Sequence, residues 1–149
     1  MLSAESLQKI DFELSKYPAD QRRSAIMGAL RIAQTEHGFL PTELIEFVAN
    51  YVGIAPVAAY EVATFYNMYD LTPVGTHKLT VCTNLPCALR GGVDAADYLK
   101  RKLGIGFGET TADGKFTLLE GECMGACGDA PVMLVNNHKM CSFMTPEAI

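Results

Sequence analysis

Five cysteines occur among the 149 residues of this chain, and four of them form two close pairs. The pairs are Cys82-x4-Cys87 and Cys123-x3-Cys127, with 35 residues between them. An odd number of cysteines argues against complete disulfide pairing, and thiols stay reduced in the cytosol. Four thiolates are the ligand set of a [2Fe-2S] cluster. The pairs therefore predict metal or redox chemistry, with a [2Fe-2S] cluster as the leading interpretation.

The spacing within each pair suits one iron of such a cluster. Two tetrahedral irons share two bridging sulfides and take two protein ligands each. Proximity assigns Cys82 with Cys87 to one iron, and Cys123 with Cys127 to the other.

Other metal sites fit the pattern less well. Structural zinc usually takes C-x2-C pairs, although wider spacings occur, so an all-cysteine zinc site is the main rival. A plant-type ferredoxin would have its third cysteine at Arg90, and a Rieske centre would need histidines within the pairs. The C-x-x-C pair of a thioredoxin-like oxidoreductase is absent from the sequence.

Glycines accompany both pairs. Gly91 and Gly92 follow the first pair, and Gly125 and Gly128 lie within and just after the second. Glycine lets the backbone approach closely and offer N–H donors to cluster sulfurs, although turns alone also favour glycine. The fifth cysteine, Cys141, is expected on a strand as a small buried hydrophobe.

The first half of the chain shows helical patterning throughout. Apolar residues recur at helical spacing, and proline or glycine stands at the segment ends. Helices are expected over residues 3–16, 21–37, 41–53 and 56–68. Helices this short are only marginally stable on their own, so they should pack as one small bundle or pack against the second half of the chain. The aromatic residues of the fourth helix are expected to serve packing: Tyr60, Phe65, Tyr66 and Tyr69.

The second half, after a break at residues 72–75, mixes strands with one helix. Strands are expected over residues 77–83, 116–119, 132–135 and 139–140, with a helix over 92–103, in the order β-α-β-β-β. Each cysteine pair lies at or just after the end of a predicted strand, and loops at strand ends of one small sheet can converge. Thr145 and Pro146 are typical of a helix start, so a last helix is expected to be truncated or vestigial at Ile149.

Composition excludes several classes of function. Apolar residues make up 49% of the chain and charged residues 19%, which is typical of a globular protein. The net charge of -5 makes nucleic acid a poor partner. No apolar run approaches the roughly 20 residues that span a bilayer, and the first residues lack signal-peptide features. We therefore expect a soluble, cytosolic protein without direct membrane insertion.

With these residues in view, the chain resembles the peripheral-arm [2Fe-2S] subunit of NADH:quinone oxidoreductase, the E subunit of respiratory complex I. The motifs that carry the resemblance stand in the family's order: HGFLP (37–41), VATFYNM (62–68), PVGTH (73–77), VCTNLPC (81–87), GETT (108–111) and CMGACGDAP (123–131). The resemblance implies an α+β fold, with a small helical bundle (1–75) followed by a thioredoxin-like [2Fe-2S] ferredoxin domain (76–149). It implies the cluster ligands Cys82, Cys87, Cys123 and Cys127, leaves Cys141 outside the motif, and places a cis bond before Pro131.

The resemblance also implies partners. Such subunits sit beside a larger flavoprotein that binds FMN and oxidises NADH, and their cluster exchanges single electrons with that flavin. Other peripheral-arm subunits would be further partners, and the chain would be cytoplasmic, held at the periphery of the membrane through the complex. Because the sequence carries no flavin or dinucleotide motif of its own, the isolated chain is expected not to oxidise NADH.

Alternative functions stay open on the sequence. The same module occurs in NAD-linked hydrogenases and formate dehydrogenases, which sequence barely separates from complex I. A zinc-stapled adaptor would use the same cysteines for folding only and would be colourless. A free-standing thiol oxidoreductase would need a vicinal cysteine pair with a lowered pKa.

Overall fold

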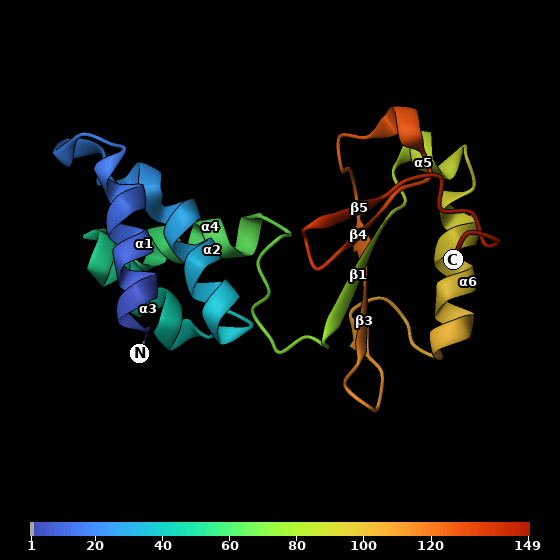
Figure 1. Cartoon of the computed structure of the whole chain (residues 1–149), viewed down its shortest axis with the longest axis horizontal. Coiled ribbons are helices and arrows are strands. Elements are labelled where there is room, and N and C mark those ends of the chain that lie inside the picture. The colour runs from blue at the N-terminus through green and yellow to red at the C-terminus, as the bar shows by residue number, and fades with distance from the viewer. Residues whose placement is uncertain (1) are drawn as a thin grey trace. The chain divides into compact units, whose positions relative to one another are not determined.

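The computed structural model describes residues 2–149, which divide between Pro73 and Val74 into two compact units. The first unit is helical, and the second contains the strands (Figure 1). Helices together with a mixed sheet confirm the α+β class expected from the sequence. Among residues 2–149, no helix combines the length and the apolar character that a bilayer crossing requires.

Within residues 2–73, four α-helices and one 3-10 helix make up the first unit. They are α1 (Ala4–Ser15), η1 (Ala19–Ala25), α2 (Ile26–His37), α3 (Thr42–Val52) and α4 (Pro56–Phe65). The hydroxyl of Ser3 caps α1 by accepting from the Ser6 N–H at 3.2 Å. Gly38 and Gly53 end α2 and α3 with left-handed φ values of 95° and 85°. The largest fully buried side chains of this unit are Ile10, Leu30, Leu40, Ile45, Val48 and Val52.

The fourth helix ends three residues before its predicted end at 68, because tertiary hydrogen bonds hold the residues that follow it. On α2, the Gln34 side chain donates to the Met68 carbonyl at 2.9 Å and accepts from the Asp70 N–H at 2.7 Å. The buried Tyr69 donates its hydroxyl to the Met27 carbonyl, also on α2, at 2.9 Å. These bonds direct the chain across α2 instead of along the axis of α4.

The aromatic residues of this segment divide into one buried and three exposed side chains. Tyr69 packs in the core, as expected. The packing expected for the other three was wrong, since Phe65 is 80% exposed and Tyr60 and Tyr66 are also exposed. The aromatic pattern alone did not distinguish the two environments.

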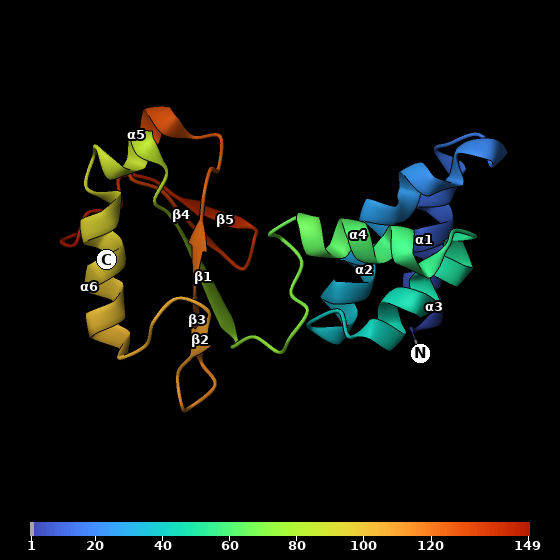
Figure 2. The same cartoon turned by 180° about the vertical axis from the view of Figure 1, so that it is seen from behind.

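Within residues 74–149, a five-stranded sheet has the order β2-β3-β1-β4-β5. The strands are β1 (His77–Cys82), β2 (Glu109–Thr110), β3 (Phe116–Gly121), β4 (Met133–Val135) and β5 (Lys139–Cys141). The central strands β1 and β3 run parallel, and the remaining neighbours are antiparallel. Helix α6 (Gly92–Leu103) lies along one face of the sheet in both views (Figures 1 and 2). Their shared core contains Leu79, Val81, Ala96, Leu99, Leu118 and Met133.

Three short elements of the second unit were not predicted from the sequence. The helix α5 (Leu85–Ala88) spans four residues, the edge strand β2 spans two, and the 3-10 turn η2 (Cys127–Asp129) spans three. All three are too short to leave a periodic pattern in the sequence. At the C-terminal end, the expected helix start forms a single turn, in which the Ala148 and Ile149 N–H groups donate to the Thr145 carbonyl at 2.9 and 3.2 Å.

Candidate metal centre

The parallel pairing of β1 with β3 brings the two cysteine segments to one edge of the sheet. Cys82 is the last residue of β1 and is the register partner of Gly121, the last residue of β3. The chain reaches Cys123 two residues later. The Cys82 thiol contacts the Glu122 carbonyl, with Sγ 3.4 Å from the oxygen. In Figures 1 and 2, α5 and the short 3-10 turn η2 (Cys127–Asp129) lie at the same end of this unit.

The first cysteine pair is buried. The residues Cys82 and Cys87 are 3% and 1% exposed, and both pack with Ala130 and Val132. Burial raises the pKa of the Cys82 thiol, and the neighbouring Cys87 raises that pKa further. A thiol must lose its proton to ligate iron, so metal binding at this pair is coupled to proton release.

Gly92 packs against both residues of this pair. A Cβ atom on Gly92 would lie 2.8 Å from the Cys82 carbonyl oxygen and 2.9 Å from the carbonyl group of Cys87. The start of α6 therefore holds the two ends of the first cysteine loop at close range. Gly128, by contrast, has open space where a Cβ would lie. Close approach accordingly explains glycine at position 92 and not at position 128.

The second cysteine pair is exposed. Cys123 and Cys127 both lie at the surface, and the N–H of Gly125 donates to the Cys123 sulfur at 3.4 Å. Gly125 adopts a left-handed φ of 70°, which lets the loop turn between the two cysteines. The Ala130–Pro131 bond that follows is cis, as the resemblance implied.

The donor set fits a two-iron cluster. Each loop supplies two thiols, as each iron of a [2Fe-2S] cluster requires, and the Gly125 N–H already donates to one sulfur. Among residues 2–149, no three His, Cys, Asp or Glu side chains are grouped as ligands of a single ion. Cys141 lies on β5 and packs instead against the core that contains Leu79 and Leu118.

The helix α5, which carries Cys87, was not predicted from the sequence. Asn84 caps this helix by accepting from the Leu85 N–H at 2.7 Å, and a proline stands in its first turn. An asparagine cap followed by proline is a helix-start signal that could have been found in the sequence. The helix matters because it turns Cys87 inward and leaves Leu85 and Leu89 exposed.

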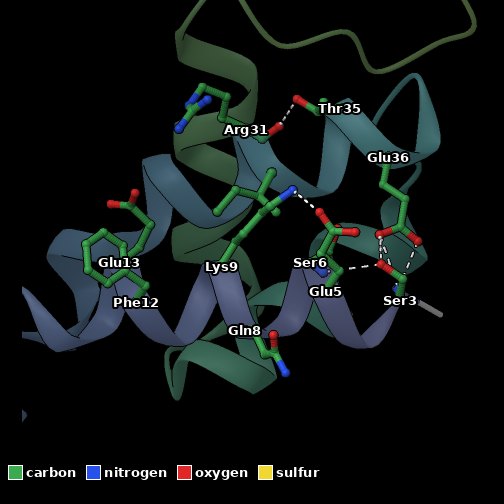
Figure 3. Close-up of a pocket in the computed structure, with 11 residues that line it drawn as sticks. Ser3, Glu5, Ser6, Gln8, Lys9, Phe12, Glu13, Arg31, Thr35 and Glu36 are labelled. Atoms are coloured by element: carbon green, nitrogen blue, oxygen red, sulfur yellow. Dashed lines mark hydrogen bonds and ion pairs between the residues drawn. The ribbon is translucent and has the colours of Figure 1, made fainter.

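A groove between α1 and α2 in the helical unit is distinct from the cysteine loops (Figure 3). Polar and charged groups lining it bond to one another: Lys9 donates to Glu5 at 2.7 Å, and the Ser3 hydroxyl donates to Glu36 at 2.8 Å. The groove contains no cysteine, and we assign it no part in the metal centre.

Comparisons with known proteins identify the family. Residues 10–149 match the family described as thioredoxin-like [2Fe-2S] ferredoxin. The E subunit of the NADH-quinone oxidoreductase of Rickettsia bellii is 49% identical over 135 residues, covering 90% of this chain and 80% of that protein. The mitochondrial NADH dehydrogenase [ubiquinone] flavoprotein 2 of Dictyostelium discoideum is 46% identical over 134 residues, 89% of this chain. The chain spans about half (54%) of the length of this Dictyostelium relative.

A solved structure supports the fold. A crystal structure of an NAD+-reducing [NiFe]-hydrogenase in the air-oxidized state matches with a TM-score of 0.67 at 20% identity, covering 85% of this chain and 22% of the hydrogenase chain. At that identity the likeness concerns the fold alone. The family match over residues 10–149 and the high identity to the Rickettsia protein together show that the chain belongs to the E-subunit family of NADH-quinone oxidoreductase, built on a thioredoxin-like [2Fe-2S] ferredoxin domain.

Proposed function

We propose that this chain is the electron-transfer subunit that holds a [2Fe-2S] cluster on Cys82, Cys87, Cys123 and Cys127. The cluster supplies one-electron redox chemistry, and its partner is a flavoprotein subunit that binds FMN and oxidises NADH. The observation that supports the proposal is the parallel β1–β3 pairing, in which Cys82 at the end of β1 is the register partner of Gly121, two residues before Cys123. The other peripheral-arm subunits would anchor the chain in the complex.

The chain's own residues have separate tasks in this proposal. Cys82 and Cys87 hold one iron from the buried side, where packing with Ala130 and Val132 excludes water. Cys123 and Cys127 hold the other iron at the surface, where a partner can approach. Backbone N–H groups of the loops offset the negative charge of the sulfurs, as the Gly125 N–H does at Cys123.

Exposed apolar side chains beside the cysteine loops support docking of the flavoprotein at this end. Leu85, Leu89 and Val93 follow each other at intervals of four residues beside the buried Cys87, and Leu89 is 77% exposed. Phe143, 57% exposed, follows β5 and donates its N–H to the Asp129 carbonyl beside the second pair. Exposed apolar side chains near one another in the chain are candidates for a protein interaction surface. Electron exchange with a flavin needs the partner at this end, because the cluster would lie here.

Metal analysis and cysteine variants test the ligand set. Protein purified without oxygen is expected to contain two irons and two acid-labile sulfides per chain and to take up one electron. Replacing Cys82, Cys87, Cys123 or Cys127 by serine should lower iron content and destabilise residues 74–149, because cluster binding is coupled to folding. Cys141→Ser is the matched control and should keep the iron. Stoichiometric zinc, or loss of iron only in Cys141→Ser, would contradict the proposal.

Reconstitution with the flavoprotein tests the electron path. The isolated chain should not oxidise NADH, because a hydride carries two electrons and a [2Fe-2S] cluster accepts one. With the flavoprotein present, NADH should reduce the cluster, and cluster loss should leave the flavoprotein's NADH oxidation with an artificial acceptor intact. NADH turnover by the isolated chain would refute this assignment. The subunits that co-purify would identify the host complex and separate complex I from an NAD-linked hydrogenase or formate dehydrogenase.

A charge placed among the exposed apolar residues Leu85, Leu89 and Val93 tests whether the flavoprotein docks there. Leu89→Asp should weaken co-elution with the flavoprotein while the chain keeps its iron, because a carboxylate would be buried unpaired at the interface. Phe12→Asp, at a 65% exposed position of α1, is the control and should co-elute normally. If Leu89→Asp co-elutes with the flavoprotein as well as the unsubstituted chain does, Leu89 and its apolar neighbours are not part of the interface.

A further inference from the structure

Residues 142–144 are bonded to the turn that carries Cys127. The Ser142 hydroxyl donates to the Asp129 carboxylate at 2.8 Å. The Phe143 N–H donates to the Asp129 carbonyl at 2.9 Å, and the Met144 N–H donates to the Pro131 carbonyl at 2.8 Å. Two of these bonds are between backbone groups, so only the Ser142–Asp129 bond fixes a side chain.

The segment that makes these bonds is itself anchored in the sheet. It follows β5 directly, and β5 is paired with β4 through Cys141 and Met133. Met144 and Ile149 also pack against the core between α6 and the sheet. The Ser142 hydroxyl is therefore presented from a fixed position, and Asp129 is held against the framework of the fold.

Asp129 brings a carboxylate into the turn that carries Cys127, two residues after this cysteine of the second pair. Both residues belong to η2, with Cys127 at its start and Asp129 at its end, and both are exposed. Glu120, Glu122 and Arg90 contribute further charges near the two loops, and these charges stay the same when Asp129 is replaced. Substituting Asp129 alone therefore changes one charge against a constant background.

We propose that Asp129 and Ser142 are positioning residues that tune the reduction potential of the cluster, with Ser142 holding the Asp129 carboxylate at one place beside Cys127. This inference rests on the ligand set of the proposed function. Four thiolates give a [2Fe-2S] cluster a formal charge of about -2 when oxidised and about -3 when reduced. A carboxylate fixed nearby disfavours the added negative charge, so it lowers the reduction potential.

An EPR-monitored redox titration of the full chain tests the proposal. Asp129→Asn keeps the size of the side chain and an oxygen that can accept from Ser142, so it removes only the charge. It should raise the midpoint potential with both irons retained, and the shift should shrink with added salt because the carboxylate is exposed. Ser142→Ala should cause a smaller rise and broaden the EPR lines, because the freed carboxylate samples several positions. Ser142→Thr should restore both.

The matched control is Asp113→Asn, which removes the same charge at the opposite end of β3. Asp113 precedes this strand of six residues, whereas the cysteine loop follows it, and six residues of strand span about 20 Å. The control should leave the potential unchanged. The proposal would be overturned if Asp129→Asn had the same midpoint potential as the unsubstituted chain. It would also be overturned if Asp113→Asn shifted the midpoint potential as much as Asp129→Asn does.

Other outcomes also decide the matter. Lower iron content in Asp129→Asn with an unshifted potential for the remaining cluster would show a structural role only, and would refute the tuning role. If Asp129→Asn fails to fold, Ser142→Ala decides: an unchanged midpoint potential together with unchanged EPR line widths in that variant would refute the tuning role. An unsubstituted chain without a [2Fe-2S] cluster would contradict the proposed function itself, which the iron and sulfide analysis shows independently.

Discussion

Replacing Gly92 by alanine sets two opposing effects against each other. Gly92 is the first residue of α6, and alanine favours a helix over glycine by up to about 1 kcal/mol. The added Cβ would meet the Cys82 carbonyl oxygen at 2.8 Å and the Cys87 carbonyl group at 2.9 Å. These are backbone atoms of the two cysteines, so they cannot rotate away as a flexible side chain could.

The steric effect should be the larger one. Overpacking a tight contact destabilises a protein by about 1–3 kcal/mol, so the expected net loss for Gly92→Ala is about 1–2 kcal/mol. The unit that contains Gly92 spans Val74–Ile149. For a unit of this size, each kcal/mol lowers the melting temperature by about 4–8 °C. Pushing apart the carbonyls of the first cysteine loop should also reduce iron content.

The assay compares Gly92→Ala with Gly128→Ala, a change of the same size beside the second cysteine pair. At Gly128 no atom lies within 4 Å of the place a Cβ would take, and the residue needs no left-handed φ, so alanine should be tolerated there. Thermal unfolding is followed by the visible absorption of the cluster and, in metal-free protein, by circular dichroism. The clash lies between polypeptide atoms, so it should persist without metal. Equal stability and iron content in the two variants would refute the steric reasoning.

Two further predictions concern one residue in each unit. Burial raises the pKa of Tyr69 from 10.0 to about 12. As the pH rises, Tyr69 therefore ionises in the unfolded chain before it ionises in the folded chain. The free energy of unfolding of the helical unit, measured by denaturant titration, should be unaffected below pH 10 and should fall as the pH rises towards 12. The fall should be weaker in Tyr69→Phe, which has no hydroxyl to ionise. Asn136, at a left-handed φ of 52°, accepts from the Lys78 N–H at 2.7 Å and donates to the Thr76 carbonyl at 3.2 Å. Asn136→Ala loses both bonds and the tolerance of asparagine for this φ, so it should lower the free energy of unfolding by about 2–4 kcal/mol. Asn136→Gly loses the bonds but tolerates this φ, so its loss should be about 1 kcal/mol smaller. Equal losses of stability in the two variants would contradict a contribution from the left-handed backbone.

The sequence predicted elements whose signals are local. Gly38 and Gly53 marked the ends of α2 and α3, and apolar spacing marked the helices between them. The end of α4 could not be predicted, because it depends on hydrogen bonds from Gln34, a residue more than thirty positions away in the chain. Such long-range bonds leave no pattern in the segment that they terminate.

The sequence predicted which cysteines form the candidate site, but it did not predict how exposed each of them is. The spacing of the four cysteines indicated which thiols could act together. It did not show that the first pair is buried and the second exposed, because this depends on how residues 130 and 132 pack after the second loop. The bond between Ser142 and Asp129 likewise joins residues thirteen positions apart, with no motif to connect them.

The parallel pairing of β1 with β3 has a consequence for the order of events during biosynthesis. The strand that ends at Cys82 leaves the ribosome before α6 and β3, yet its register partner Gly121 is made 39 residues later. A nascent chain that stops short of β3 has only half of the thiols and none of the strand that aligns the other half. With the proposed ligand set, all four cysteines are present only after β3 and the loop that follows it have been made, so the cluster would form only after this crossover.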